Sequence, residues 1–449
     1  MPNTNEPQAA FKLLLTPDRS ALAAGHPTTL RVLARIQAPE PPADAPPRRP
    51  LHLALVLDRS GSMSGAPLAE AKRCARHIVD GLAPGDRAAV VAFDDEVVRV
   101  APLTPAADKL TLAAALVSIE SGGSTDLHGG WRAGADELAG KLAGDDVYRV
   151  ILLSDGCANA GETDLETIAG QCKTLAQRGV STSTYGLGRD FNETLMLAMA
   201  AAGRGNAYYG QTAADLAEPF ASEFALLTNL CARGLVLKVH APANLGVRLR
   251  NDYAPVDGDA LAWHLPDLAF ASEAWALFEF TIPPDDVADK NVVTLPVTVS
   301  VQAAAVESAP LFLMGSLPAL PVVGRAQWEM MPADALVAQR ALELDAADAL
   351  ANVRAAIEAD DWTRTKQLVD AAAARFAHHP WAAAILASMH RLIDERDKRL
   401  AAKEAAFTTR TMRSRIASVN EPRFCAAEQM KIPAYLRRKA EQGKGRRDH

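Results

Sequence analysis

The sequence predicts an α/β fold with a doubly wound, mainly parallel sheet, inserted in a β-sandwich and followed by an α-helical region. Two observations on the 449 residues support this prediction. Strand-like apolar runs alternate with helical patterns over residues 51–230, whereas strand-like runs alone recur over residues 231–325. Fully apolar runs such as Leu53–Leu57 are typical of strands buried on both faces of a parallel sheet.

The N-terminal residues 10–48 are predicted to supply the first strands of the β-sandwich. They contain two strand-like runs, 11–15 and 28–36, and the second partly alternates apolar with polar residues, as a half-exposed antiparallel strand does. The proline-rich stretch 39–50 then predicts a stiff connector. We expect the two strands to pair with those of residues 231–325. The alternative is an N-terminal hairpin that packs on the α/β domain itself.

Residues 51–230 are predicted to form the α/β domain. Pro67 suits the first turn of a helix, because its missing N–H would have no partner there. The expected strands are 53–57, 88–93, a short edge strand 97–100, 148–153, 180–185 and 206–209. The expected helices are 67–82, 109–119, 127–142, 165–178, 191–202 and 213–230.

The C-terminal part of the chain changes character twice. Residues 332–407 are alanine-rich with helical spacing, and a plain helical bundle is favoured over a repeat solenoid, which usually needs about three repeats. Residues 408–449 carry eleven Lys and Arg against four Asp and Glu, a net charge of +7. We expect a basic, partly disordered docking tail, and three targets stay open for it: an acidic partner, nucleic acid, or the acidic body of the chain itself.

Composition excludes several classes of function. The chain is 49% hydrophobic and 22% charged, with a net charge of −7, which argues against general nucleic-acid binding. No reading motif for sequence-specific nucleic-acid binding is present. The five cysteines lack C-x-x-C spacing, and no apolar run reaches the about 18 residues of a membrane span. We therefore expect reduced thiols and a cytoplasmic location.

The most informative motif follows the first strand of the α/β domain. Asp58, Ser60 and Ser62 form a D-x-S-x-S pattern where open α/β sheets place their ligands. Oxygen-only sets favour Mg²⁺, Mn²⁺ or Ca²⁺ over zinc or copper. A phosphatase-like D-x-D motif would have a second carboxylate at position 60, where this chain has a hydroxyl. The alternative without a metal is a loop with an Asx-turn and a helix cap.

Two later stretches of the sequence favour a metal site over a loop with only an Asx-turn and a helix cap. The Gly-rich loop 122–127 carries Thr125, and the apolar run 150–153 leads into Asp155. With these features, residues 51 to about 230 resemble a bacterial-type von Willebrand factor type A (VWA) domain with an intact metal-ion-dependent adhesion site. The resemblance implies that the metal is held by three hydroxyls and two carboxylates, some through water: Asp58, Ser60, Ser62, Thr125 and Asp155.

Three neighbouring residues are candidates for the rim that an incoming ligand touches. They are Arg59, Asp126 and Asn159. Asp126 could instead cap the following helix, and Arg59 and Asn159 could be ordinary exposed loop residues.

The resemblance implies a function in metal-dependent protein–protein interaction. A bound Mg²⁺ (or Mn²⁺/Ca²⁺) leaves one position for an acidic side chain of a partner. We therefore expect a scaffold or assembly factor without catalytic residues, not an enzyme. Two alternatives remain open: a divalent-metal-dependent hydrolase, and a VWA fold whose metal is purely structural.

Overall fold

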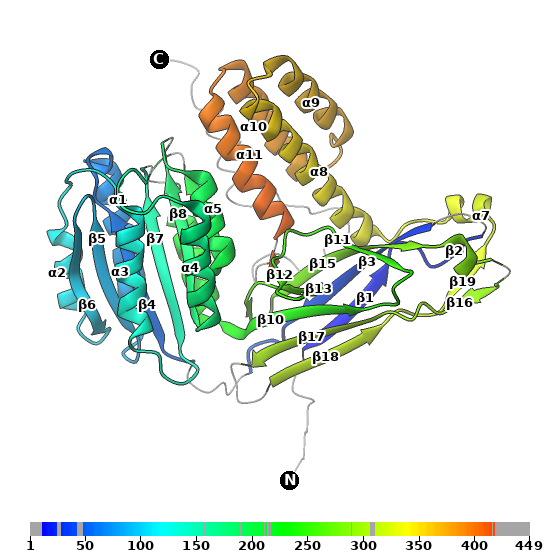
Figure 1. Cartoon of the computed structure of the whole chain (residues 1–449), viewed down its shortest axis with the longest axis horizontal. Helices are drawn as coiled ribbons and strands as arrows, with labels where there is room; N and C mark the ends of the chain where they lie inside the picture. The colour runs from blue at the N-terminus through cyan, green and yellow to red at the C-terminus, as the bar shows by residue number, and fades with distance from the viewer. Residues whose placement is uncertain are drawn as a thin grey trace, which may run out of the picture. The chain divides into compact units, whose positions relative to one another are not determined.

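The computed structural model consists of two compact units (Figure 1). Unit 1 comprises residues 1–45, 230–396 and 408–449, and unit 2 comprises residues 46–229 and 397–407. The structure describes residues 11–24, 28–42, 48–156, 158–188, 190–210, 212, 215, 217–288, 290–305, 310–414 and 416–417. None of the helices in these ranges is both long enough and apolar enough to cross a membrane.

Unit 2 is organised around one sheet. Its strands are β4 (Leu51–Asp58), β5 (Arg87–Phe93), β6 (Val97–Pro105), β7 (Val147–Ser154), β8 (Val180–Leu187) and β9 (Arg204–Gly210). Their order across the sheet is β6-β5-β4-β7-β8-β9, and every pair is parallel except β5 with β6. Every residue of β4 and β7 is buried, as the apolar runs predict. The predicted mainly parallel sheet is confirmed.

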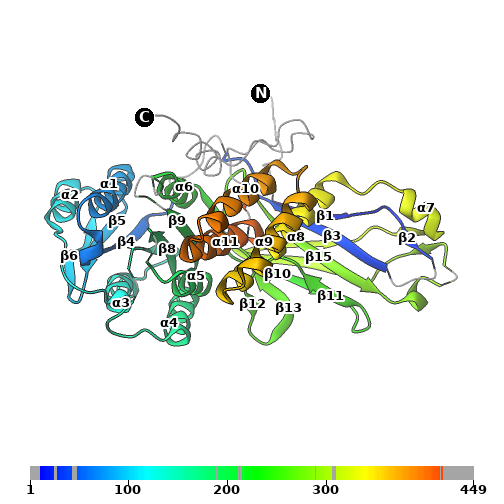
Figure 2. The same cartoon turned by 90° about the horizontal axis from the view of Figure 1, so that it is seen from above.

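Helices cover both faces of this sheet (Figure 2). They are α1 (Ala66–Gly81), α2 (Lys109–Ser118), α3 (Leu127–Ala139), α4 (Leu165–Gln177), α5 (Glu193–Ala202) and α6 (Ala217–Thr228), with a short 3-10 turn, η1 (Gly61–Met63), before α1. Helices α1, α2 and α6 lie on one face, and α3, α4 and α5 lie on the other. The fully buried Trp131 of α3 anchors the second face, because its Nε1 donates to Thr182 Oγ1 of β8 at 3.1 Å.

Unit 1 contains two antiparallel sheets that share one apolar core. The first sheet holds β1 (Lys12–Pro17), β3 (Thr28–Gln37), β15 (Glu273–Ile282) and β11 (Gly246–Leu249), with β20 (Ile416–Ala417) beside β15. The second holds β12 (Pro255–Val256), β13 (Asp259–His264), β10 (Leu230–His240), β17 (Thr298–Ala305) and β18 (Pro310–Ser316), with β14 (Leu268–Ala269) beside β10. Val32 and Phe278 of the first sheet and Leu237 and Val301 of the second belong to the same buried cluster.

The N-terminal strands of unit 1 pair with strands that follow unit 2 in the sequence. Strand β3 pairs along its whole length with β15, from Thr28 opposite Ile282 to Gln37 opposite Glu273. A further small sheet joins β2 (Leu22–Ala23), β16 (Val292–Val293) and β19 (Leu320–Val323), next to a 3-10 turn, η3 (Pro284–Asp286).

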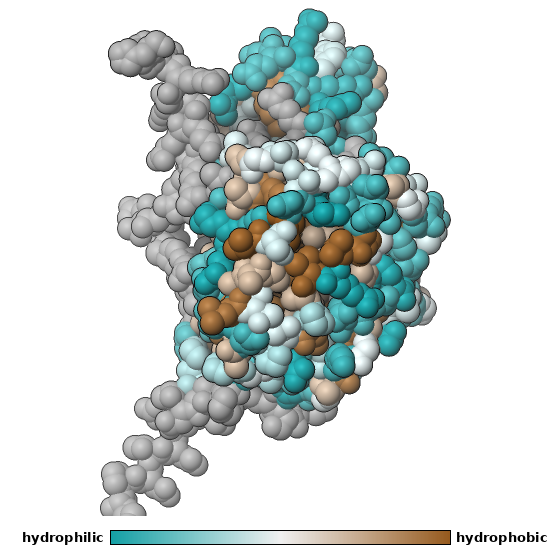
Figure 3. All heavy atoms as spheres, turned by 90° about the vertical axis from the view of Figure 1, so that its left-hand side faces the viewer, coloured by the Kyte–Doolittle hydropathy of each residue, from teal (hydrophilic) through white to brown (hydrophobic). Residues whose placement is uncertain are grey.

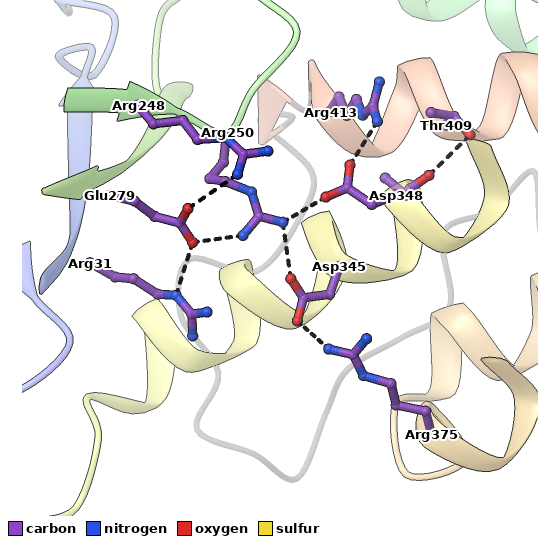
Figure 4. A network of polar contacts seen from close by, with 10 residues as sticks. Arg31, Arg248, Arg250, Glu279, Asp345, Asp348, Arg375, Thr409 and Arg413 are labelled. Carbon is purple, nitrogen blue, oxygen red and sulfur yellow. Dashed lines mark hydrogen bonds and ion pairs between the residues drawn. The ribbon is translucent and has the colours of Figure 1, made fainter. Parts of the chain in front are cut away.

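The helical region of unit 1 packs against the first sheet. Its helices are α7 (Arg325–Met330), α8 (Ala335–Glu358), α9 (Trp362–Arg375), α10 (Pro380–Asp394) and the end of α11 (Lys398–Arg413). Arg250, which follows β11 and has 7% of its side chain exposed, donates to Glu279 at 2.9 Å, Asp345 at 3.0 Å and Asp348 at 2.8 Å (Figure 4). One guanidinium therefore joins β15 to α8.

The basic tail begins later than its charge pattern predicts. Helix α11 continues to Arg413, and Thr408 and Met412 are buried. Arg413 donates to Asp348 of α8 at 2.7 Å, so this cation belongs to the folded unit. Residue 415 and residues 418–449, which hold most of the predicted tail, lie outside the described residues.

Candidate metal centre

The candidate centre lies at the carboxyl edge of the sheet in unit 2. Asp58 is the last residue of β4, and Asp155 directly follows β7, the neighbouring strand. Backbone hydrogen bonds join the loop after β4 to the loop before α3: the N–H of Gly61 donates to the carbonyl of Gly123 at 3.0 Å, and that of Gly122 to the carbonyl of Arg59 at 2.7 Å. Three segments distant in sequence therefore meet at one edge.

The structure brings the five predicted ligands together. Ser60 Oγ lies 3.2 Å from Ser62 Oγ, and Ser62 Oγ donates to Asp155 Oδ1 at 2.7 Å. Thr125 and Asp58 both lie next to the backbone of Gly156. A β-carbon on this glycine would be 2.9 Å from Thr125 Oγ1 and 3.6 Å from Asp58 Oδ2. The threonine hydroxyl and the Asp58 carboxylate thus line the same small space.

Asp58 is fully buried and is held by neutral donors. The backbone N–H of Ser60 donates to Asp58 Oδ1 at 2.8 Å, and the hydroxyl of Ser154 donates to Oδ2. Burial raises the pKa of Asp58 above its ordinary value and the charge of Asp94 adds to this, while the hydrogen bonds of Ser154 and Ser60 act in the opposite direction. Sequence reasoning missed Ser154, although it is the hydroxyl residue directly before Asp155.

Asp155 is also costly to ionise in the absence of a cation. Burial raises its pKa to about 6, and the charge of Asp58 contributes to the rise, while the hydrogen bond from Ser62 opposes it. No Lys or Arg of the described residues forms an ion pair with Asp58 or Asp155. Two partly desolvated carboxylates next to three neutral hydroxyls are a donor set that fits a hard divalent cation.

Most side chains of this donor set supply hydroxyl oxygens. In the part of the chain that the structure describes, no three His, Cys, Asp or Glu side chains come together as a metal-binding group. The candidate centre contains only two carboxylates and takes its other oxygens from Ser60, Ser62 and Thr125.

Asp94, a residue outside the predicted set, connects the loop after β4 with the loop before α3 through hydrogen bonds. It follows β5, and it accepts hydrogen bonds from Arg59 Nη2 at 2.9 Å and from the N–H groups of Gly123 at 3.0 Å and Glu96 at 2.9 Å. Burial opposes its ionisation, but these donors outweigh burial and hold the pKa of Asp94 below its ordinary value. Its place at the carboxyl end of a strand is the sequence signal that could have identified it.

The three predicted rim residues each have a partner within the loops. Arg59 pairs with Asp94 as described above. Asp126 accepts from the N–H of Gly129 at 2.8 Å and so caps α3. The Asn159 side chain accepts from the N–H of Thr125 at 3.0 Å, and the N–H of Asn159 donates to the carbonyl of Thr125 at 3.2 Å. These contacts position Thr125, and contact with a ligand stays a prediction.

Comparisons with known proteins agree with the fold of unit 2. The family model of the von Willebrand factor type A domain matches residues 52–221. An uncharacterized protein of Synechocystis sp. is 32% identical over 240 residues, which cover 52% of this chain and 55% of that protein. The chain thus spans about half of this relative's length.

Two solved structures resemble a larger part of the chain. One is a von Willebrand factor type A protein from Catenulispora acidiphila, with a TM-score of 0.65 and 19% identity over 86% of this chain and 91% of that one. The other is the ArnB paralog VWA2 from Sulfolobus acidocaldarius, with a TM-score of 0.59 and 18% identity over 90% of this chain and 99% of that one. At such identities the likeness shows the fold alone. From the family match and the fold together, residues 52–221 of this chain are a von Willebrand factor type A domain.

Proposed function

We propose that the VWA domain of this chain binds a divalent cation, with Mg²⁺ preferred, at an intact metal-ion-dependent adhesion site. Asp58, Ser60, Ser62, Thr125 and Asp155 would hold it, directly or through water. The ion would supply positive charge and a position for one carboxylate oxygen of a partner protein. The chain would then act as a metal-dependent interaction module and not as an enzyme.

The observation that carries this proposal is a pair of carboxylates, Asp58 fully buried and Asp155 partly buried, with no Lys or Arg ion pair among the described residues. Ionised Asp58 and Asp155 face each other's charge in a partly desolvated edge of the sheet. Buried charges are normally paired or coordinate metals, because an unpaired one is expensive to remove from water. Arg59, which follows Asp58 in the sequence, forms its ion pair with Asp94 instead.

The neutral hydroxyls support ligand capture over catalysis. They complete a coordination shell without cancelling the positive charge, so a negatively charged oxygen from outside is still attracted. Hydrolysis would need a positioned base or nucleophile. The histidine of the adjoining helix, His128, instead contacts Gln171 Oε1 at 3.0 Å.

Unit 1 supports a scaffold role. We interpret its two sheets as one β-sandwich into which the VWA domain is inserted, because β3 precedes that domain, β10 and β15 follow it, and β3 pairs with β15. In this interpretation the sandwich and the helices present the metal centre within a larger assembly.

A capture experiment tests the partner-binding part of the proposal. The immobilised 449-residue chain is exposed to native lysate in Mg²⁺ or in chelator, and bound proteins are identified for wild type, Thr125→Ala and Ser124→Ala. Ser124 is the matched control, because it adjoins Thr125 but its side chain is not among the predicted ligands.

The expected result is a set of proteins retained in Mg²⁺ by wild type and Ser124→Ala, and lost in chelator and in Thr125→Ala. If the same proteins are retained in chelator and by Thr125→Ala, the proposal is contradicted. Metal-dependent turnover of phosphoester or peptide substrates, lost in Asp155→Asn, would favour the hydrolase instead. A metal that raises the melting temperature without changing capture would indicate a structural role.

A further inference from the structure

An apolar surface lies at the edge of the VWA domain that β6 and α2 form. Val97 and Val98 of β6 are 37% and 40% exposed, and Leu110 and Val117 of α2 are 84% and 74% exposed. Figure 3 shows apolar side chains gathered on the face that carries β6 and α2 in Figure 1. Exposed patches of this kind mark interaction surfaces more often than isolated apolar residues do.

The exposed residues of α2 form a stripe. Leu110, Ala114 and Val117 are spaced i, i+4, i+7, so they share one face of the helix, and all three are exposed. The opposite face of α2 is buried through Leu112, Ala113, Ala115 and Leu116. The helix is therefore apolar on the side that packs in the domain and also on its outer side.

Strand β6 is an edge strand that is protected along only half its length. In its second half, Pro102 and Pro105 have no N–H, and the N–H of Leu103 donates to Glu137 Oε2 of α3 at 3.2 Å. In the described part of the chain, β5 is the only strand paired with β6. The register with β5 shifts between Arg99 and Ala101, so the regular part of the first half is residues 97–99, which have neither a proline nor a covering side chain of this kind. Unprotected edges of this sort accept another strand.

We propose that this surface is a dimer interface in which β6 of one copy pairs with β6 of a second copy and the two α2 helices pack together. A two-fold axis at Val98 places Val98 of one copy opposite Val98 of the second copy. Arg99 of one copy then lies opposite Val97 of the second. No like charges then face each other across the strands.

One symmetry operation covers both parts of the surface, and this favours a second copy over an unrelated strand. Val97 and Arg99 line a groove with α3, so Val98, between them in the strand, points to the opposite face, where α2 lies. A two-fold axis through the sheet keeps both α2 helices on that same face, where their apolar stripes can meet. A single added strand from another protein would leave Leu110 and Val117 exposed.

The mass of the full-length protein in solution tests this proposal. Sedimentation or light scattering over about 1 to 100 µM should show a dimer that dissociates on dilution. Leu110→Glu/Val117→Glu should weaken the dimer at least about tenfold, because it places two charges in each apolar stripe. Phe312→Glu is the matched control, since Phe312 is 54% exposed on β18, an edge strand of unit 1.

Cross-linking tests the position of the axis. Opposed residues of an antiparallel pair lie about 4.5 to 5.5 Å apart at Cα, within the reach of a disulfide. Mild oxidation of Val98→Cys should therefore give a covalent dimer, whereas wild type and Phe312→Cys should not. The proposal is overturned by a monomer at all concentrations, by a dimer insensitive to Leu110→Glu/Val117→Glu, or by cross-linking at position 312 in place of 98.

Discussion

At the scale of single residues, burial in the metal-free centre disfavours the ionised forms of Asp58 and Asp155. Asp58 is fully buried and Asp155 is partly buried, and the charge of Asp58 helps to raise the pKa of Asp155. Ser60, Ser62 and Ser154 donate hydrogen bonds that stabilise the charged forms only in part. A divalent cation would reverse this balance, because it favours the ionised forms of both.

Metal binding should therefore depend on pH. The pKa of Asp155 in the metal-free protein is about 6, so a proton occupies this ligand at lower pH and must leave before the metal binds. Mg²⁺ affinity should be flat above about pH 7 and should fall about tenfold per pH unit below about pH 6. Titration calorimetry at several pH values checks this. An affinity unchanged down to about pH 5 would mean that Asp155 does not ligate the ion.

The sequence is informative about residues that terminate strands. Asp58 and Asp155 can be recognised because each follows an apolar run and parallel strands share one carboxyl edge. Asp94 could have been recognised by its place at a strand end in the same way, but the contacts that it makes with Arg59 could not be predicted. They depend on a side-chain pair between loops that are adjacent only after the sheet has formed.

At the scale of elements, a buried ionic network fixes the last helix of the VWA domain to the sheet. Glu223 of α6 is fully buried and accepts from Arg149 of β7, from Ser183 Oγ at 2.7 Å, from Asn206 Nδ2 at 2.7 Å and from Tyr208 OH at 2.9 Å. Burial opposes the ionisation of Glu223, but Arg149, Asn206 and Ser183 outweigh it and hold its pKa below the ordinary value. The helix is thus attached to β7, β8 and β9 through one carboxylate.

Breaking this network should destabilise the domain strongly. Glu223→Gln removes the carboxylate charge that the buried guanidinium of Arg149 contacts, and breaking a buried ion pair in this way costs about 3 to 5 kcal/mol in the free energy of unfolding. Denaturant unfolding measures this loss. Arg149→Met/Glu223→Gln is the control: because it removes both charges, it should lose less than the sum of the two single variants. Strict additivity would show that the pair is not energetically coupled.

The ends of two elements, β6 and α11, could not be predicted from the local sequence pattern. The sequence predicts a short edge strand at 97–100, but β6 continues to Pro105 because its second half is supported by Glu137 of α3. Helix α11 passes position 407 for a similar reason. Its last turns are stabilised by burial of Met412 and by the Arg413–Asp348 ion pair, which a charge count cannot reveal.

At the scale of the whole molecule, unit 1 depends on a polar connection between its sheet and its helices. Arg250 links Glu279 of β15 to Asp345 and Asp348 of α8, and Arg31 and Arg375 extend the network (Figure 4). Burial opposes the positive charge of Arg250, but the hydrogen bonds that it donates to Asp345 and Glu279 outweigh burial and raise its pKa above the ordinary value.

Removing this arginine should loosen the helices of unit 1. Arg250→Met leaves Glu279, which is 14% exposed, with only peripheral cations, and we expect a loss of about 1 to 3 kcal/mol in the free energy of unfolding. Arg248→Met is the matched control, because Arg248 is 71% exposed and lies 3.8 Å from the same Glu279. Equal losses in the two variants, measured by denaturant unfolding, would contradict this role for Arg250.

The architecture of the chain was partly accessible from its sequence. The alternation of strands and helices predicts the parallel sheet of unit 2, because buried strands and amphipathic helices have different periods. The pairing of β3 with β15 could only be expected in outline. Its register depends on contacts between segments more than 200 residues apart.

The central claim is that Asp58, Asp155 and the neighbouring hydroxyls hold one divalent ion, and Mg²⁺ titration tests it most directly. Wild type and Ser124→Ala should each bind one ion per chain, whereas Asp58→Asn and Asp155→Asn should lose saturable binding. Both Asn variants should stay folded in chelator, because each removes a carboxylate whose ionisation burial disfavours. Indistinguishable isotherms for wild type and the two Asn variants would contradict the account.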